Sequence, residues 1–209
     1  MSIRLGDTAP DFTAETTAGL LSFHEWKGSS WAVLFSHPAD FTPVCTTELG
    51  RTAALSGEFA ARNAKPIAVS VDSIEAHHRW IPDIAEVAGV PVDFPIIADQ
   101  DRAVAQAYDM IHPGEGDTST VRSVFLIDPN NKVRLTITYP KSVGRNFAEI
   151  LRALDALQAT DGAPISTPVD WAPGERVIVA PTISTSDAQE RFKNVDEVKP
   201  YLRFADAPA

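Results

Sequence analysis

The sequence predicts an α/β fold in which helices flank a mixed central sheet. Short apolar runs alternate with segments that show helical periodicity. The first runs are apolar throughout, which is typical of buried strands joined by crossover helices. The last two strand candidates are separated only by a turn, which predicts an antiparallel hairpin. Crossovers together with a hairpin indicate an α/β sandwich with a mixed sheet.

The first elements are a strand, a helix, a second strand and a second helix. Residues 31–36 (Trp-Ala-Val-Leu-Phe-Ser) lie between glycine-serine and proline breakers, which predicts a buried strand. Pro43 suits the first position of a helix, which we expect to reach about residue 62. Residues 66–71 form the second buried strand, and Ser73 caps a helix toward residue 84. Pro82 lies inside this pattern and should kink or end the helix.

The alternation continues in the next part of the chain. Residues 94–98 are a third apolar run, 103–108 a short helix, and the segment 109–120, with its glycines and proline, a loop. Residues 123–127 and 133–139 flank a turn and should pair as a hairpin. The next helix begins at a capping-box-like pair, Asn146 and Glu149, and its apolar residues keep helical spacing to Leu157.

The composition changes after residue 160. The remaining segment is rich in proline, with one short strand candidate at 176–180 and a polar helix candidate at 186–192. About 50 residues with so few apolar positions cannot build a strong core alone. The sequence therefore predicts a main domain, residues 1–160, and a small α+β domain, residues 161–209, which must pack on the main domain or on a second subunit.

Composition and charge exclude several functional classes. The net charge is −10 at pH 7, and no basic run is present, so neither nucleic acid nor an anionic membrane is an expected partner. We expect no signal peptide and no membrane span, because no stretch approaches the ~20 apolar residues that a span requires. A single cysteine permits no disulfide within the chain. These features predict a cytoplasmic protein.

The only cysteine, Cys45, lies where a reactive thiolate is expected. With Thr42 as N-cap, its hydroxyl accepting from the first turn, and Pro43 as the first helical residue, Cys45 is the third residue of the helix. Unpaired N–H groups and the helix dipole favour an anion in this turn, and the thiolate is the nucleophilic form of cysteine. The alternative is a small buried hydrophobe. Because cap, proline and position agree, we favour the thiolate.

These residues also carry a family resemblance. The pattern Pro38-x-x-x-Thr42-x-x-Cys45 resembles the active-site motif of the peroxiredoxins, which have a thioredoxin-like fold. The longer run from Ser36 to Gly50 is similar to the one-cysteine, peroxiredoxin 6-like subfamily of this AhpC/TSA-type family. Three further segments are similar to that subfamily, namely residues 144–152, 167–171 and 201–203. The resemblance therefore covers nearly the whole chain.

The resemblance implies roles for four residues in a thiol peroxidase. Cys45 corresponds to the peroxidatic cysteine, Thr42 to the catalytic threonine, Pro38 to the proline that shields the site, and Arg122 to the catalytic arginine. A thiolate that attacks a peroxide splits the O–O bond and becomes a sulfenic acid. An arginine stays charged and would stabilise both the thiolate and the charge that builds on the oxygens. Without the resemblance, Arg122 would be read as a surface arginine at a strand end.

Three further residues are secondary candidates. Arg145 matches a second family arginine near the site, but could equally be a loop residue before a helix. His37 is placed to approach the sulfur or the substrate, or else is a structural histidine at a strand end. Glu48 would hydrogen-bond an active-site arginine, or only match the helix dipole. No metal site is expected, because the chain has one cysteine and no histidine pair at i, i+4.

Two other activities are alternatives to peroxide reduction. Some relatives also carry a calcium-independent phospholipase A2 activity, assigned to a His, a Ser in Gly-x-Ser-x-Gly and an Asp. His24 and Ser30 match the first two, but the last glycine is missing and Asn130 stands in place of the aspartate, so we expect only a remnant of a lipase site. A holdase chaperone is the second alternative, and no feature of the sequence favours it.

The expected partners follow from the chemistry and the resemblance. The substrates are hydrogen peroxide or organic hydroperoxides, and no cofactor is expected. With no second cysteine, the sulfenic acid must be reduced by an external reductant, for which glutathione, a thioredoxin-type protein and ascorbate are open. The family forms homodimers or rings of dimers. We expect residues 161–209 to hold a dimer together and partly cover the partner's active site; the alternative is that they fold back on their own domain.

Overall fold

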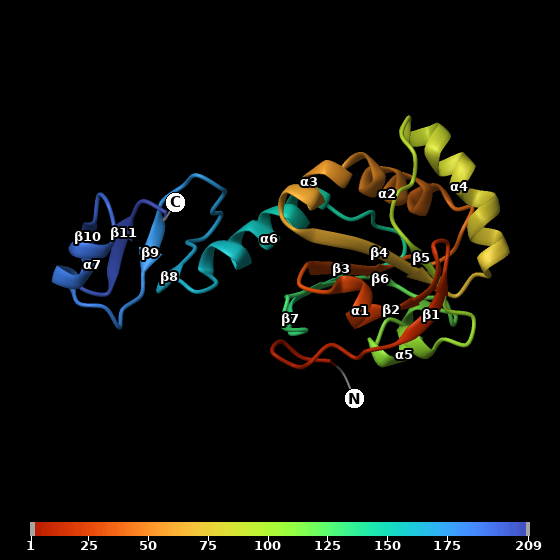
Figure 1. Ribbon diagram of the computed structural model, residues 1–209, viewed down its shortest axis with the longest axis horizontal. Helices are drawn as coiled ribbons and strands as arrows, with labels where there is room; N and C mark the ends of the chain where they lie inside the picture. Colours follow the sequence, from red (N-terminus) through yellow and green to blue (C-terminus); the bar gives the residue numbers. More distant parts are fainter. Residues whose placement is uncertain (1–2, 208–209) are drawn as a thin grey trace. The chain divides into compact units, whose positions relative to one another are not determined.

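The computed structural model describes residues 3–207 and divides the chain into two compact units. The first unit extends to Phe147 and the second begins at Ala148 (Figure 1). The helix that begins at Phe147 thus belongs mainly to the second unit, whereas the sequence-based boundary lies after it, at residue 160. Ala156 and Ala159 of this helix pack against apolar residues of the C-terminal segment, which explains the division.

The first unit is built on a mixed sheet of seven strands, in the order β2-β1-β5-β4-β3-β6-β7 (Figure 1). The strands are β1 (Thr13–Thr16), β2 (Gly19–Ser22), β3 (Trp31–Ser36), β4 (Ala64–Ser70), β5 (Ile96–Ala98), β6 (Arg122–Ile127) and β7 (Val133–Tyr139). Parallel pairs join β3 to β4 and β4 to β5, and the other pairs are antiparallel. The mixed sheet and the β6–β7 hairpin confirm the predicted class.

Helices cover both faces of this sheet. They are α1 (Phe23–Lys27), α2 (Pro43–Ala54), α3 (Ser56–Ala61), α4 (Ile74–Ala88) and α5 (Ala103–Ala107), with a 3₁₀ turn η1 (Pro113–Glu115) in the predicted loop. Figure 1 shows α2, α3 and α4 on one face, and α1 and α5 on the other. Side chains of α1 and α5 pack with alternate residues of β3, β4 and β6 in one apolar core. Across residues 3–207, no helix has the length and apolarity that crossing a bilayer requires.

The single helix predicted from residue 43 to about 62 is wrong, because two helices meet at Leu55. This residue has φ −99° and ψ 11°, and its N–H donates to the carbonyls of both Arg51 and Thr52. The next residues are Ser56 and Gly57, which favour a helix less than most residues do. The Leu55 side chain is buried, and this burial stabilises the chain at the junction of the two helices. The first of these two helices, α2, carries Cys45.

The sequence predicts that Pro82 kinks or ends the helix; α4 continues past it to Ala88, so the second of these alternatives is wrong. The helix closes instead at Gly89, whose φ of 71° is left-handed. Proline removes the hydrogen bond to the carbonyl of His78. Both residues are exposed, so water can satisfy that carbonyl. The buried residues Trp80 and Ile84 lie on either side of the proline and hold the helix to the core.

The second unit contains two helices and a small sheet. They are α6 (Phe147–Thr160), α7 (Thr185–Arg191), and four strands, β8 (Ile165–Ser166), β9 (Val177–Val179), β10 (Asp196–Lys199) and β11 (Leu202–Ala205), in the order β10-β11-β9-β8. Trp171 and Val177 centre one apolar cluster, and Val179 and Ala205 another. The predicted strand and helix of the tail are confirmed by β9 and α7.

Candidate active site

Cys45 is the third residue of α2 and is completely buried. The chain leaves the buried strand β3 at Ser36, crosses a short loop, and enters α2 at Pro43. Pro38, in this loop, is also buried. The predicted proline start and the predicted position of Cys45 are therefore confirmed. In the first turn of a helix, the dipole favours an anionic sulfur.

Thr42 is the N-cap of α2, but its side chain does not make the expected cap. Its backbone is extended, with φ −112° and ψ 146°, and its hydroxyl makes no hydrogen bond to the first turn. The hydroxyl instead donates to the carbonyl of Ala39 at 2.8 Å. The Thr42 carbonyl accepts from the N–H of Thr46 at 3.0 Å. Thr42 thus braces the loop and leaves the first-turn N–H groups unoccupied by its own side chain.

Arg122 lies directly beside the sulfur. It is the first residue of β6 and is 3% exposed, so the alternative of a surface arginine is wrong. Its Nη1 lies 3.3 Å from Cys45 Sγ and 2.6 Å from Glu48 Oε2. Its Nε and Nη2 donate to the carbonyl of Lys141 at 2.9 and 2.7 Å. Four contacts therefore fix this guanidinium, and its Nη1 lies against the sulfur of Cys45.

Glu48 and Arg145 complete the charged cluster. Glu48 lies three residues after Cys45, and its Oε1 accepts from the backbone N and Nε of Arg145 at 2.8 and 3.0 Å. Arg145 Nη2 donates to Glu48 Oε2 at 2.6 Å, and its Nη1 to the Ser36 carbonyl at 2.8 Å. Burial alone would raise the pKa of Glu48, but Arg145 and Arg122 lower it overall. Two cations and one carboxylate leave a net positive charge beside Cys45, which favours its thiolate.

His37 forms a hydrogen-bonded cluster with two residues that the sequence analysis did not select. Its Nε2 lies 2.9 Å from Asp40 Oδ1, and His77 Nδ1 lies 2.6 Å from Asp40 Oδ2. All three side chains are buried. His77 lies on α4, far from the motif in sequence, so no local pattern could have paired it with Asp40.

The same three residues bring possible metal-ligand atoms within 4.8 Å of one another. Each oxygen of Asp40, however, lies at hydrogen-bond distance from an imidazole nitrogen. The contacts are those of a hydrogen-bonded triad. That the protein has no metal site stays a prediction.

His24 and Ser30 are bound to different partners. His24 Nε2 lies 3.0 Å from the carbonyl of Ala9, and the Ser30 hydroxyl donates to Asn63 Oδ1 at 2.9 Å. The buried Lys27 donates to the Ser30 carbonyl at 3.2 Å and to the Asp128 carbonyl at 3.0 Å. Both residues thus have structural partners, and a nucleophilic serine activated by His24 is not formed in this state.

Comparison with known proteins places the chain in a family. Residues 5–136 match the model of the AhpC/TSA family, and residues 156–194 match the C-terminal domain of 1-Cys peroxiredoxin. The mitochondrial peroxiredoxin PRX1 of Saccharomyces cerevisiae is 50% identical, over 97% of this chain and 80% of the yeast protein. Peroxiredoxin-6 of Rattus norvegicus is 48% identical, over 98% of this chain and 97% of the rat protein.

Solved structures agree with the sequence comparison. The C45S mutant of the peroxiredoxin 6 of Arenicola marina superposes with a TM-score of 0.94 at 44% identity, covering 99% of both chains. The yeast mitochondrial 1-Cys peroxiredoxin superposes with a TM-score of 0.92 at 50% identity, covering 98% of this chain and 99% of the yeast chain. With the buried thiol at a helix start and the arginine against it, these matches show that the chain belongs to the AhpC/TSA family as a 1-Cys peroxiredoxin, and so is a peroxidase.

Proposed function

We propose that Cys45 is the peroxidatic residue and reduces hydrogen peroxide and organic hydroperoxides. The contact of 3.3 Å between Arg122 Nη1 and Cys45 Sγ carries this assignment. The thiolate attacks one peroxide oxygen, the O–O bond breaks, and the second oxygen leaves as water or an alcohol after taking a proton. The sulfur becomes a sulfenic acid.

Arg122 supports both the reactant and the transition state. A guanidinium fixed by four contacts does not need to reorganise when negative charge moves from sulfur to the departing oxygen. Glu48 and Arg145 are positioning residues in this account, because they hold Arg122 and set the net charge around it. Pro38 lies in the loop that leads from β3 to α2, and Thr42 is the N-cap of α2. Rotation of the Thr42 hydroxyl away from Ala39 would let it donate to a bound peroxide.

Reduction of the sulfenic acid requires a reductant from outside the chain, since Cys45 is the only cysteine, and we propose a thiol. The external thiol condenses with the sulfenic acid, releases water and leaves a mixed disulfide. A second thiol then restores Cys45. One similar structure concerns thiol resolving in a yeast relative through glutathione and thioredoxin systems. We assign the same class of reductant here, glutathione or a thioredoxin-type protein, in preference to ascorbate.

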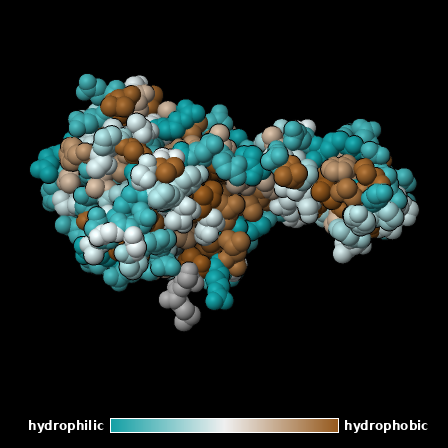
Figure 2. Space-filling view, turned by 180° about the vertical axis from the view of Figure 1, so that it is seen from behind, coloured by the Kyte–Doolittle hydropathy of each residue, from teal (hydrophilic) through white to brown (hydrophobic). Residues whose placement is uncertain are grey.

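A homodimer and a cytoplasmic location complete the proposal. The second unit exposes large apolar side chains, with Val169 at 87%, Val198 at 51% and Tyr201 at 70% exposure. Figure 2 shows hydrophobic residues gathered on the visible face of this unit. Such a surface suits a second copy of the chain. One relative carries a mitochondrial name, so fractionation of cells is the test of location.

Stopped-flow kinetics of the purified protein with hydrogen peroxide test the assignment. Cys45→Ser should abolish the reaction, and Arg122→Met should slow it by roughly 10²–10³-fold, as expected for losing one donor to developing charge. Arg51→Met, an exposed arginine on the same helix, is the control and should react like the wild type. Peroxide reduction that survives Cys45→Ser would refute the proposal.

A further inference from the structure

The cluster of His37, Asp40 and His77 is built into the segment that leads to the reactive cysteine. His37 directly follows β3, Asp40 lies in the loop before α2, and His77 lies on α4. A single carboxylate thereby joins three separate parts of the first unit. The side chains of both histidines are 0% exposed and that of Asp40 is 2% exposed. Buried polar groups of this kind hold one geometry, because each loses its partners if it moves.

Both ring nitrogens of His77 have partners inside the protein. Its Nδ1 meets the Asp40 carboxylate at 2.6 Å, and its Nε2 meets the carbonyl of Ile97 at 3.2 Å. A carboxylate and a carbonyl only accept hydrogen bonds. His77 therefore bridges the Asp40 carboxylate and the backbone carbonyl of Ile97. Burial alone would raise the pKa of Asp40, but the hydrogen bonds from the two histidines lower it overall, in agreement with the ionised form.

His37 differs from His77, because only one of its ring nitrogens has a partner. Its Nε2 donates to Asp40, while its Nδ1 is buried with no partner among residues 3–207. Burial lowers the pKa of His37, although the Asp40 carboxylate opposes this. His37 is thus the neutral form with hydrogen on Nε2.

Within the loop of residues 37–42, Phe41 is both strained and exposed. Phe41 has a φ of 54°, a left-handed value that is rare outside glycine, and its side chain is 53% exposed. Phe41 and His37 both lie against the ring of Trp80, at centroid distances of 6.2 and 5.3 Å. The backbone N–H of Asp40 donates to Asp72 at 3.0 Å. Asp40 therefore holds, by backbone and side chain, the loop on which Pro38 and Thr42 lie.

We propose that Asp40 and His77 are positioning residues for peroxide reduction: their buried hydrogen bond holds the loop of residues 37–42, and with it Pro38 and Thr42, in register with Cys45. This inference rests on the proposed role of Cys45. The side-chain hydrogen bonds of Asp40 and His77 run to His37, Ile97 and each other, and not to the sulfur. Both residues therefore act through the loop. A loop that shifts by about 1 Å can cost up to 10²-fold in rate.

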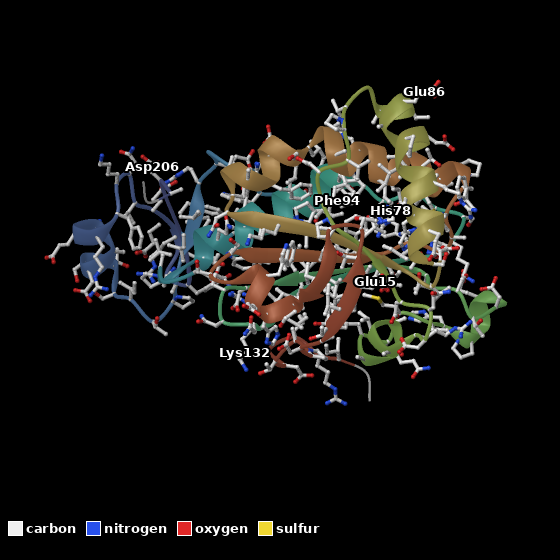
Figure 3. All side chains as sticks on the ribbon, turned by 45° about the vertical axis from the view of Figure 1, so that its right-hand side comes forward. Glu15, His78, Glu86, Phe94, Lys132 and Asp206 are labelled. Carbon is white, nitrogen blue, oxygen red and sulfur yellow. The ribbon has the colours of Figure 1, made fainter. Side chains whose placement is uncertain are left out.

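A pair of variants at His77 separates positioning from space filling. His77→Asn places an amide N–H near the position of Nδ1 and can still donate to Asp40. His77→Gln places it near Nε2 and can reach only the Ile97 carbonyl. We expect His77→Gln and Asp40→Asn to slow the reaction of Cys45 with peroxide by about 10- to 100-fold, and His77→Asn to recover most of that loss. His78→Gln is the matched control, because His78 is the exposed neighbour on α4 (Figure 3).

Two further readouts make the test specific. Alkylation of Cys45 by iodoacetamide needs a thiolate but no peroxide-shaped pocket, so its rate should change far less than the peroxide rate in Asp40→Asn. Nitrogen-15 NMR of the wild type should show a buried imidazole, that of His37, with hydrogen on Nε2 only. If Asp40→Asn reacts with peroxide like the wild type, or if both His77 variants lose rate equally, the inference is wrong. A wild type without any Cys45-dependent reaction would instead refute the proposed function.

Discussion

Glu48 is the residue on which the charge balance around Cys45 depends. Two buried guanidiniums, from Arg122 and Arg145, share its carboxylate, and one of them also touches the sulfur. Without this anion, two cations would be buried side by side. With it, the cluster has a net charge of one, which is enough to favour the thiolate while the fold stays intact. Glu48 thus links stability and reactivity.

Glu48→Gln should lower both the unfolding free energy and the rate of reaction with peroxide. Removing one partner of a buried ion pair typically costs about 3–5 kcal/mol of unfolding free energy. We expect a loss in this range in urea unfolding, together with slower reaction with peroxide, because Arg122 loses its shortest contact. Glu58→Gln is the control, since its pair with Arg62 is at the surface and should contribute less than about 1 kcal/mol. Equal stabilities of the two variants would contradict this account.

His37 should make stability depend on pH in mildly acidic solution. Burial lowers its pKa in the folded state, so the folded protein binds this proton less readily than the unfolded chain does. The contribution is complete above an unfolded pKa of about 6.5 and is lost as pH falls below it. We expect the unfolding free energy to decrease between about pH 6.5 and 5, and the decrease to be smaller in His37→Gln. Parallel pH profiles for the two proteins would show that His37 does not contribute.

Local signals in the sequence explain where the thiol lies, and the functional roles of the residues around it stay predictions. A proline start, an N-cap and a family motif are local signals, and they placed Cys45 in the first turn of α2. Arg122 contacts the sulfur, Glu48 contacts Arg122, and Arg145 contacts Glu48. The direction of the Thr42 hydroxyl was not predictable, because the same threonine can cap the helix or brace the loop. The pairing of Asp40 with His77 depends on how α4 packs, which no local pattern encodes.

At the scale of elements, long apolar runs were recognised and short edge elements were not. Strands β3, β4, β6 and β7 have strong hydrophobic patterns and were all predicted. The first hairpin, β1 and β2, and the helix α1 were missed. Each strand has only four residues, and β2 exposes Leu20 at 79%. These elements are specified mainly by pairing at the sheet edge, where β1 bonds to β5 through Thr16 and Ile97.

Pro82 provides a test of how α4 is held. The helix accepts the proline because its buried face continues on both sides, at the cost of one hydrogen bond to the His78 carbonyl. Pro82→Ala should restore that bond and raise the unfolding free energy, by up to about 3 kcal/mol. Urea unfolding measures this directly. A destabilised Pro82→Ala protein would mean that the proline makes packing contacts that outweigh its missing N–H.

At the scale of the whole molecule, we expect the C-terminal unit to bind a second copy of the chain. Its two apolar clusters are small, and its strand β10 is exposed along its full length. We expect the full-length chain to sediment as a dimer, and a chain that ends at Thr160 to sediment as a monomer with altered peroxide kinetics. A truncated protein that remains a dimer with unchanged kinetics would show that residues 161–209 serve neither the interface nor the site.

The central claim is that one thiol, Cys45, performs the peroxide chemistry. The most direct measurement is the intact mass of the wild-type protein after one equivalent of hydrogen peroxide, with a sulfenic-acid reagent present to trap the product. We predict one added oxygen, with the trapping reagent located on Cys45 by peptide mapping and absent from Cys45→Ser. Normal consumption of peroxide by a protein whose Cys45 stays unmodified would contradict the account.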